Sequence, residues 1–223
     1  MDGDAVTPAN FAACMADLAR VNTITLARPP TLRWLAAATR RLVPGDRFTL
    51  LDVGYGEGDM LRAVYRWARR RGLATALTGF DLNPRSAPAA MAATPADMAI
   101  DYRTGDVFVE ALPVQPDYIV SSLVTHHMAD EEVVRFLRWM DATARKGWFV
   151  NDLHRHWIAF YGFKALAWAA RWHPFVRHDG PVSVARSFRR TDWEVLIAAA
   201  GLDRHTISLC WHLPFRLCVG RVK

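Results

Sequence analysis

The feature that most constrains the fold is a short run of glycines behind an apolar segment. In "LLDVGYGEGDM" (50–60), Gly54, Gly56 and Gly58 alternate with other residues directly after the apolar run. Glycine lets the backbone approach a ligand closely, and a helix that follows presents free N–H groups. A strand, a glycine turn and a helix in this order predict a ligand site at the carboxyl end of an open α/β sheet.

Strand-like and helix-like segments alternate along the chain on both sides of this turn. The expected strands are 48–54, 74–82, 99–107, 117–123 and 148–153. The expected helices are 7–22, 31–43, 58–71, an alanine-rich helix within 86–98, 130–147 and 191–201. This alternation predicts a mostly parallel sheet with helices on both of its faces.

The end of the chain departs from this pattern. Strands are expected at 205–212 and 215–222, and only "LP" separates them. Because that link is too short for a parallel crossover, these two strands must be antiparallel. Before them, Thr191 as cap and Glu194 at the third helical position predict a capping box for the last helix.

The charge and cysteine content bear on partners and location. The net charge is +6, but its densest cluster, "RWARRRG" (66–72), lies where a helix is expected to end. Cations at that point complement the helix dipole, so we expect no nucleic-acid partner. Cys14, Cys210 and Cys218 lack ligand or redox spacing, and the acidic first ten residues lack a secretory signal. Reduced thiols in a cytoplasmic protein are therefore expected.

Acidic residues around the glycine turn indicate the charge of the ligand. A dinucleotide site has the spacing G-x-G-x-x-G, whereas this chain has G-x-G-x-G with Asp52, Glu57 and Asp59 around it. These carboxylates would repel a pyrophosphate, and a cationic ligand suits them better. Asp81 ends the second strand, where a carboxylate can bind ribose hydroxyls, and Asp106 ends the third. A nicotinamide-dependent oxidoreductase is a disfavoured alternative.

Four segments together resemble class I S-adenosylmethionine-dependent methyltransferases. They are "LLDVGYGEGD", "LTGFDLNP", "YRTGDVF" and "DYIVSSLVTHH", and they span about residues 48–150. The resemblance implies a Rossmann-like, mostly parallel seven-stranded sheet of order 3-2-1-4-5-7-6 that ends in an antiparallel hairpin. It also implies S-adenosylmethionine as the cofactor. The cofactor-binding residues implied are Asp52, Gly54, Tyr55, Gly56 and Gly58 for the methionine part, Asp81 and Leu82 for the ribose, Asp106 and Val107 for the adenine, and Ser122.

Three other segments are similar to bacterial methyltransferases of phenolic polyketides, quinones or lipid-like metabolites. They are "RVNTITLARPPTLRWL", "VNDL" and "RHDGPVSVARSFRRTDW". The resemblance implies methyl transfer to a hydroxyl, or to an activated carbon, of a hydrophobic aromatic small molecule. The 223-residue chain is expected to form one domain. Its expected parts are an N-terminal helical lid (1–45), a cofactor-binding core (46–153), a helical insertion on the substrate side (154–190), and a final helix with antiparallel strands (191–223).

Histidines after the fourth strand are the candidate general bases. A hydroxyl must lose its proton as it accepts a methyl group, and histidine transfers protons near neutral pH. His127 is the preferred base and His126 its rival, although both residues would also suit a pocket wall. No triad of metal ligands is evident, so no metal is expected. Substrate-binding candidates beyond the fifth strand are Asp152, His154, Trp157, Tyr161 and Trp168.

The aromatic segment 157–175 leaves a further alternative open. It carries Lys164, Arg171 and Pro174, and so lacks the roughly 20 uninterrupted apolar residues that a membrane span needs. A helix lying on a membrane surface remains compatible with this composition. The alternative to an enzyme is therefore a cofactor-binding scaffold that makes peripheral contact with a membrane.

Overall fold

The strands of the computed structural model form one mixed sheet. The structure describes residues 21–170, 172 and 174–223, so the helix expected at 7–22 falls almost wholly outside the described residues. The strands are β1 (Arg47–Val53), β2 (Ala74–Asp81), β3 (Ile100–Thr104), β4 (Tyr118–Ser122), β5 (Gly147–Leu153), β6 (Ser208–His212) and β7 (Arg216–Val222). Their order across the sheet is β3-β2-β1-β4-β5-β7-β6, which confirms the predicted fold class.

The pairing of the strands brings several chain segments to one edge of the sheet. β1, β2, β3, β4 and β5 are parallel, and Val53 lies opposite Ser121 near the carboxyl ends of β1 and β4. β7 runs antiparallel to β5, so its first residue, Arg216, lies opposite Leu153, the last residue of β5. The start of β7 therefore lies at the same edge as the ends of the parallel strands.

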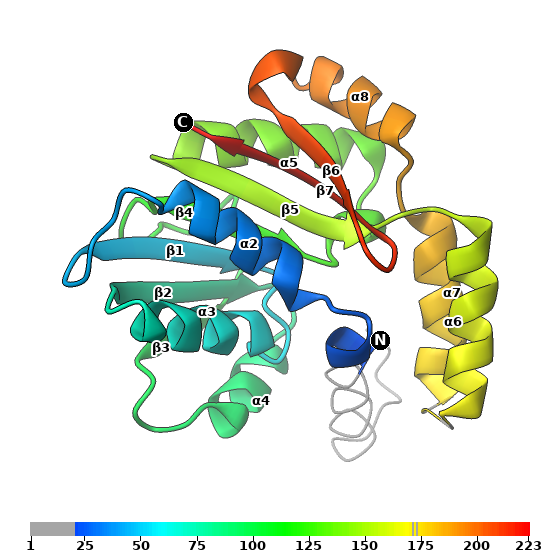
Figure 1. The fold of residues 1–223 in the computed structure, drawn as a ribbon, viewed down its shortest axis with the longest axis horizontal. Coiled ribbons are helices and arrows are strands. Elements are labelled where there is room, and N and C mark those ends of the chain that lie inside the picture. Colours follow the sequence, from blue (N-terminus) through cyan, green and yellow to red (C-terminus); the bar gives the residue numbers. More distant parts are fainter. Residues whose placement is uncertain (1–20, 171, 173) are drawn as a thin grey trace.

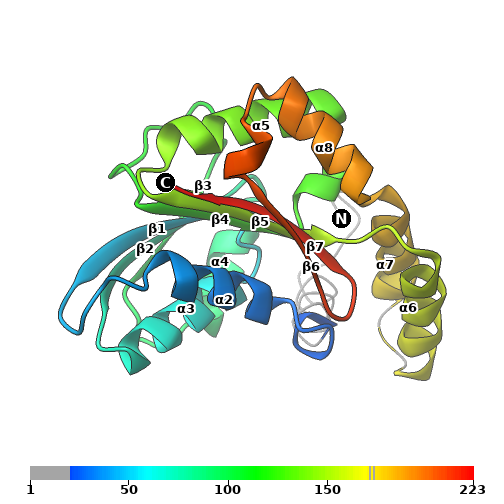
Figure 2. The same cartoon turned by 45° about the horizontal axis from the view of Figure 1, so that its top comes forward.

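Helices cover both faces of the sheet and produce two cores (Figure 2). One face carries α2 (Arg28–Ala38), α3 (Asp59–Arg70) and α4 (Ser86–Ala93), and the other carries α5 (Asp130–Thr143) and α8 (Arg190–Ala199). Fully buried residues such as Leu35 and Phe48 fill the first core, and Trp148 and Trp193 fill the second. Burial of these large apolar side chains is the main force that holds the layers together.

Two further helices stand beyond the carboxyl ends of the strands (Figure 1). They are α6 (Trp157–Ala169) and α7 (Pro174–Arg186), which pack against each other. Short 3-10 turns, η1 (Thr125–His127) and η2 (Arg204–Thr206), follow β4 and α8. None of the helices in the described part of the chain is long and apolar enough to cross a membrane.

The capping box predicted for the last helix is wrong in its register. The cap of α8 is Arg189, and Thr191 lies inside the first turn. The Asp192 carboxylate accepts a hydrogen bond from the Arg189 backbone N–H at 2.7 Å and one from the Arg155 guanidinium at 2.6 Å. Asp192 has the partner role that the sequence assigned to Glu194, because α8 begins at Arg190 and its third residue is Asp192.

Candidate active site

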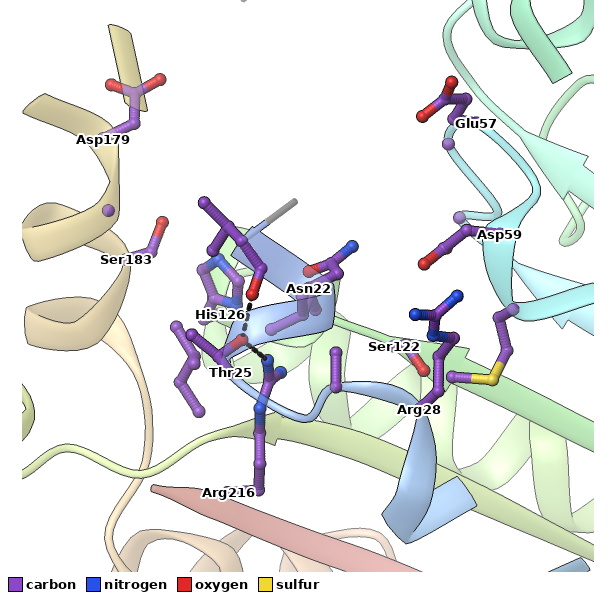
Figure 3. A pocket seen from close by; sticks show the side chains of 18 of the residues that line it. Asn22, Thr25, Arg28, Glu57, Asp59, Ser122, His126, Asp179, Ser183 and Arg216 are labelled. Carbon is purple, nitrogen blue, oxygen red and sulfur yellow. Dashed lines mark hydrogen bonds between the residues drawn. The ribbon is translucent and has the colours of Figure 1, made fainter. Parts of the chain in front are cut away.

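A cavity of about 290 Å³ opens at the carboxyl ends of β1, β4 and β5. The glycine turn and the start of α3 form one side, and η1, the start of β7 and the inner face of α7 form the other. The segment 21–28 closes it between them (Figure 3). The cavity therefore lies where open α/β sheets bind their ligands.

The glycine turn needs glycine for two different reasons. Gly54, Gly56 and Gly58 have φ of +74°, +55° and +75°, a region that other residues adopt only with strain. Gly54 and Gly56 line the cavity, and a side chain at Gly54 would also collide with Val124. Gly58 caps α3, and a side chain there would collide with the ring of Tyr102. The first two glycines expose backbone to a ligand, whereas the third permits close packing.

A cluster of carboxylates borders the turn. Asp52 is 1% exposed, and its Oδ1 has no hydrogen-bond partner among the described residues. Burial, reinforced by the negative charges of Asp59 and Asp81, raises the pKa of Asp52 well above its usual value. Burial also raises the pKa of Glu57, which lines the cavity with Asp59. Such a cluster favours a cationic ligand, because a positive charge would offset both the burial and the mutual repulsion.

Of the other residues predicted to bind the cofactor, Ser122 lines the cavity, whereas Asp81 and Leu82 do not. The buried hydroxyl of Ser122 lacks a partner in the described part of the chain. Asp81 lies behind the turn and accepts hydrogen bonds from the backbone N–H of Gly56 at 2.8 Å and of Asn83 at 2.9 Å. Each carboxylate oxygen keeps a second lone pair, so Asp81 holds the turn without losing its capacity to bind hydroxyls. Leu82, which follows it, is exposed.

Asp106, Val107 and Tyr55 are placed mainly by local structure and packing. Asp106 accepts a hydrogen bond from the Phe108 N–H at 2.9 Å, and Val107 is buried in the core beneath α5 and α8. Neither residue lines the cavity. Tyr55 does line it, and its ring packs 5.0 Å from the Tyr102 ring, while burial raises the pKa of its hydroxyl.

A histidine and an aspartate are paired at the opposite side of the cavity. His126 Nδ1 lies 2.7 Å from Asp152 Oδ1, and both side chains are almost fully buried. Asp152 also accepts hydrogen bonds from the Thr125 hydroxyl and from the backbone N–H groups of His126 and Leu153. Burial by itself would raise the pKa of Asp152, but His126 and these donors hold it below its usual value. An ionised Asp152 therefore fixes the orientation of the His126 ring.

His127 lacks this support although it is adjacent in the chain. It is exposed at the rim of the cavity, and its ring centroid lies 4.1 Å from that of His126. Partial burial and the neighbouring His126 lower the pKa of His127. Both histidines line the cavity, but only His126 is held by a carboxylate.

The residues predicted to bind substrate lie outside the cavity lining. Asp152 is enclosed by the hydrogen bonds already described, and His154 lies between β5 and α6, where burial lowers its pKa. Trp157, Tyr161 and Trp168 are 68%, 62% and 70% exposed and lie on the outer surface of α6. The aromatic residue that α6 does contribute to the cavity is Phe163. The helix was expected in the correct place, but the sequence did not show which of its faces points inward.

Several residues of the cavity were not predicted from the sequence. They include Asn22, Thr25, Arg28, Ser183 and Arg216 (Figure 3). The segment 21–28 is positioned by the buried Asn151, whose Nδ2 donates to the Ala27 carbonyl at 2.6 Å and to the Thr31 hydroxyl at 3.1 Å. The strand "FRLCVGRV" carries two arginines, Arg216 and Arg221, in a largely apolar run, and this was the one available signal for Arg216.

Comparisons with known proteins place this chain in a family. A protein-family model described as "methyltransferase domain" matches residues 26–207, which is most of the chain. The chain belongs to the methyltransferase domain family. A search of curated proteins found no match. Many solved structures share the fold, and three of them illustrate its range.

Each of the three structural relatives shares the fold at low sequence identity. Magnesium protoporphyrin IX methyltransferase (ChlM) from Synechocystis PCC 6803, with bound SAH, is 16% identical at a TM-score of 0.60, over 100% of this chain and 90% of that one. The plantazolicin methyltransferase BpumL, in complex with a triazolic desmethylPZN analog and SAH, is 14% identical at 0.62, over 96% and 95%. Human N-acetylserotonin methyltransferase with SAM is 16% identical at 0.62, over 100% and 60%.

The methyltransferase cavity fits S-adenosylmethionine, the cofactor of this family. The turn at Gly54 and Gly56 leaves backbone open to a ligand, and the unpaired Asp52 and Ser122 oxygens can accept hydrogen bonds from an ammonium group. Asp52, Glu57 and Asp59 supply the negative charge that a sulfonium cofactor requires. No group of three or more His, Cys, Asp or Glu side chains within the described residues is arranged to hold a metal ion.

Proposed function

We propose that this methyltransferase transfers a methyl group to a hydroxyl, or to an activated carbon, of a hydrophobic and aromatic small molecule. The supporting observation is that His126, which is paired with the buried Asp152, lines the same cavity as the acidic glycine turn. When bound, S-adenosylmethionine supplies the methyl group as an activated electrophile. The protein then has to align the acceptor and remove its proton.

His126 is the proposed general base. Because Asp152 holds Nδ1, Nε2 is the ring nitrogen that is left to accept a proton from the acceptor. The ionised Asp152 stabilises the imidazolium that results, and the buried hydrogen bonds around it keep the ring from rotating. His127, the preferred base from sequence, is reassigned to the rim, because it is exposed and its ring lacks a carboxylate partner among the described residues.

The lining of the substrate side supports a hydrophobic acceptor. The cavity lining includes five large apolar side chains, those of Leu123, Leu153, Phe163, Val176 and Val184. The structural relatives include enzymes named for magnesium protoporphyrin IX and N-acetylserotonin, two ring compounds, and this favours a flat acceptor. We further propose that residues 1–45 and 154–190 act as the lid and the substrate-side insertion around the core formed by 46–153, with 191–223 completing the sheet.

A two-part assay tests this function. Calorimetry with S-adenosylhomocysteine should show saturable binding, and NADH on the same preparation should show none. Methyl transfer from labelled S-adenosylmethionine to a panel of phenols, quinols and hydroxynaphthalenes should then depend on His126. A relative described as a pericyclic reaction enzyme shares this fold at 15% identity, so cofactor binding without methyl transfer to any acceptor would count against the proposal.

A further inference from the structure

Arg216 places a buried positive charge in the cavity that methyl transfer itself does not require. It is the first residue of β7, lies opposite Leu153 and is 2% exposed. Figure 3 shows its side chain rising from the strand toward Thr25 and the centre of the cavity. The Arg216 Nη2 donates to the Thr25 hydroxyl oxygen at 3.0 Å, and that hydroxyl donates to the Val21 carbonyl at 2.8 Å.

The guanidinium is incompletely satisfied. Its Nη1 is buried and has no hydrogen-bond partner within the described residues. Among the described residues, no carboxylate oxygen lies within 4.0 Å of a guanidinium nitrogen of Arg216, so Arg216 has no ion-pair partner there. Asp152 acts on Arg216 through its charge, but its oxygens already accept from Thr125, His126 and Leu153. The positive charge and one N–H group are therefore left for a ligand.

The energetics argue against a purely structural role. A buried charge without a hydrogen-bonded partner destabilises a fold by several kcal/mol, and an apolar residue of similar volume would be more favourable there. β7 already has an apolar interior at Leu217 and Val219, so the sheet does not depend on an arginine for packing. A guanidinium has planar, paired donors that match the two oxygens of a carboxylate.

The position of Arg216 indicates which ligand it contacts. The acidic side chains Glu57 and Asp59 lie across the cavity from Arg216 (Figure 3), on the side that suits the cationic cofactor. Arg216 lies on the strand next to β5, beside the elements that carry His126 and Leu153. An anion bound there would therefore belong to the methyl acceptor. Arg28, a second arginine of the lining, lies on the side of Asp59 in the same view.

We propose that Arg216 binds a carboxylate of the acceptor, so that the substrate class is a hydroxylated aromatic acid. This inference rests on the proposed function, because it assigns the acceptor half of the same cavity. Thr25 holds one edge of the guanidinium and leaves Nη1 for a carboxylate oxygen. With its carboxylate at Arg216, the acceptor would lie between β7 and α7, within the reach of His126. The side chains that α7 contributes to this part of the lining are Val176, Asp179, Ser183 and Val184.

Matched acids and esters test this proposal. Calorimetry would use the protein saturated with S-adenosylhomocysteine, titrated with 4-hydroxybenzoate and 1-hydroxy-2-naphthoate and with the methyl ester of each. The wild-type protein should bind at least one acid about tenfold more tightly than its ester, as a charge-assisted hydrogen bond implies. In Arg216→Met the ratio should fall to about one, and Arg216→Lys should retain part of it. Arg28→Met is the control and should keep the wild-type ratio.

The outcomes separate this inference from the proposed function. The protein could bind the cofactor saturably and yet bind acids and esters with equal affinity, or bind no acid at all. Either result overturns the role of Arg216 and leaves the cofactor assignment standing. Failure to bind S-adenosylhomocysteine defeats the proposed function and this inference with it. A loss of cofactor affinity in Arg216→Met as large as its loss of acid affinity would assign the arginine to the cofactor instead. The ratio of acid to ester affinity is measured on the wild-type protein, so the proposal can be refuted even if Arg216→Met does not fold.

Discussion

Replacement of Asp52 by asparagine should have opposite effects on the stability of the protein and on its affinity for the cofactor. The Asp52 carboxylate is 1% exposed, its Oδ1 is unpaired within the described structure, and Asp59 and Asp81 add negative charge. Asparagine keeps the shape of the side chain and removes the charge. We therefore expect Asp52→Asn to stabilise the cofactor-free protein and to weaken its binding of S-adenosylmethionine.

An unpaired buried polar group costs about 1–3 kcal/mol, and an unpaired charge costs more. Asparagine keeps a polar group and removes only the charge, so the gain should be on the order of 1–3 kcal/mol. For a chain of this size each kcal/mol shifts Tm by about 2–4 °C, so Asp52→Asn should raise Tm by several degrees. The folded-state pKa of Asp52 is raised, so the carboxyl group stabilises the wild type fully below its unfolded pKa of about 4. That contribution is lost as the pH rises through the folded pKa. The advantage of the variant should therefore grow with pH over this window.

Thermal unfolding without cofactor, measured from about pH 4 upward, and calorimetry with S-adenosylmethionine at neutral pH test both effects. Glu131→Gln is the control, because it removes a charge from an exposed position in the first turn of α5, outside the cavity. Its effect on Tm should not grow with pH in this way. A Tm advantage of Asp52→Asn that is the same at every pH, or unchanged cofactor affinity, would refute the reasoning.

Three further predictions concern the site and its surroundings. His126→Asn should lower kcat by about 10²–10⁴-fold with cofactor affinity nearly unchanged, whereas His127→Asn should lower kcat by less than about tenfold. Steady-state kinetics with labelled cofactor measures both effects, and the reverse order would identify His127 as the base. Gly54→Ala should abolish binding of S-adenosylhomocysteine in calorimetry, because φ is +74° and a methyl group would collide with the neighbouring side chain. The double variant Trp157→Ala/Trp168→Ala should leave kcat/KM unchanged but reduce co-sedimentation with anionic vesicles, and a matching fall in turnover would place these exposed rings in the substrate site.

The fold, and the glycine turn that borders the cavity, could be predicted because their determinants are local in the chain. The glycine turn, the acids beside it and the apolar strand before it are consecutive residues, and strand–helix alternation specifies a parallel sheet. The substrate half depends on contacts between distant segments. Arg216 and Thr25 are 191 residues apart in sequence, and Asn151 and Ala27 are 124 apart. No periodicity within one segment encodes such a pairing.

The two adjacent histidines show why "THH" does not by itself indicate which ring lies against a carboxylate. Leu123 has φ of +62°, and its N–H donates to the Asn151 carbonyl at 2.9 Å, so the chain turns sharply as it leaves β4. Asp152, on the neighbouring strand, then accepts hydrogen bonds from both the backbone N–H and the ring of His126. These contacts direct the first ring inward and leave the second at the rim. The orientation of His126, the proposed base, therefore depends on a carboxylate 26 residues further along the chain. A change that moves Asp152 should lower turnover before it weakens cofactor binding.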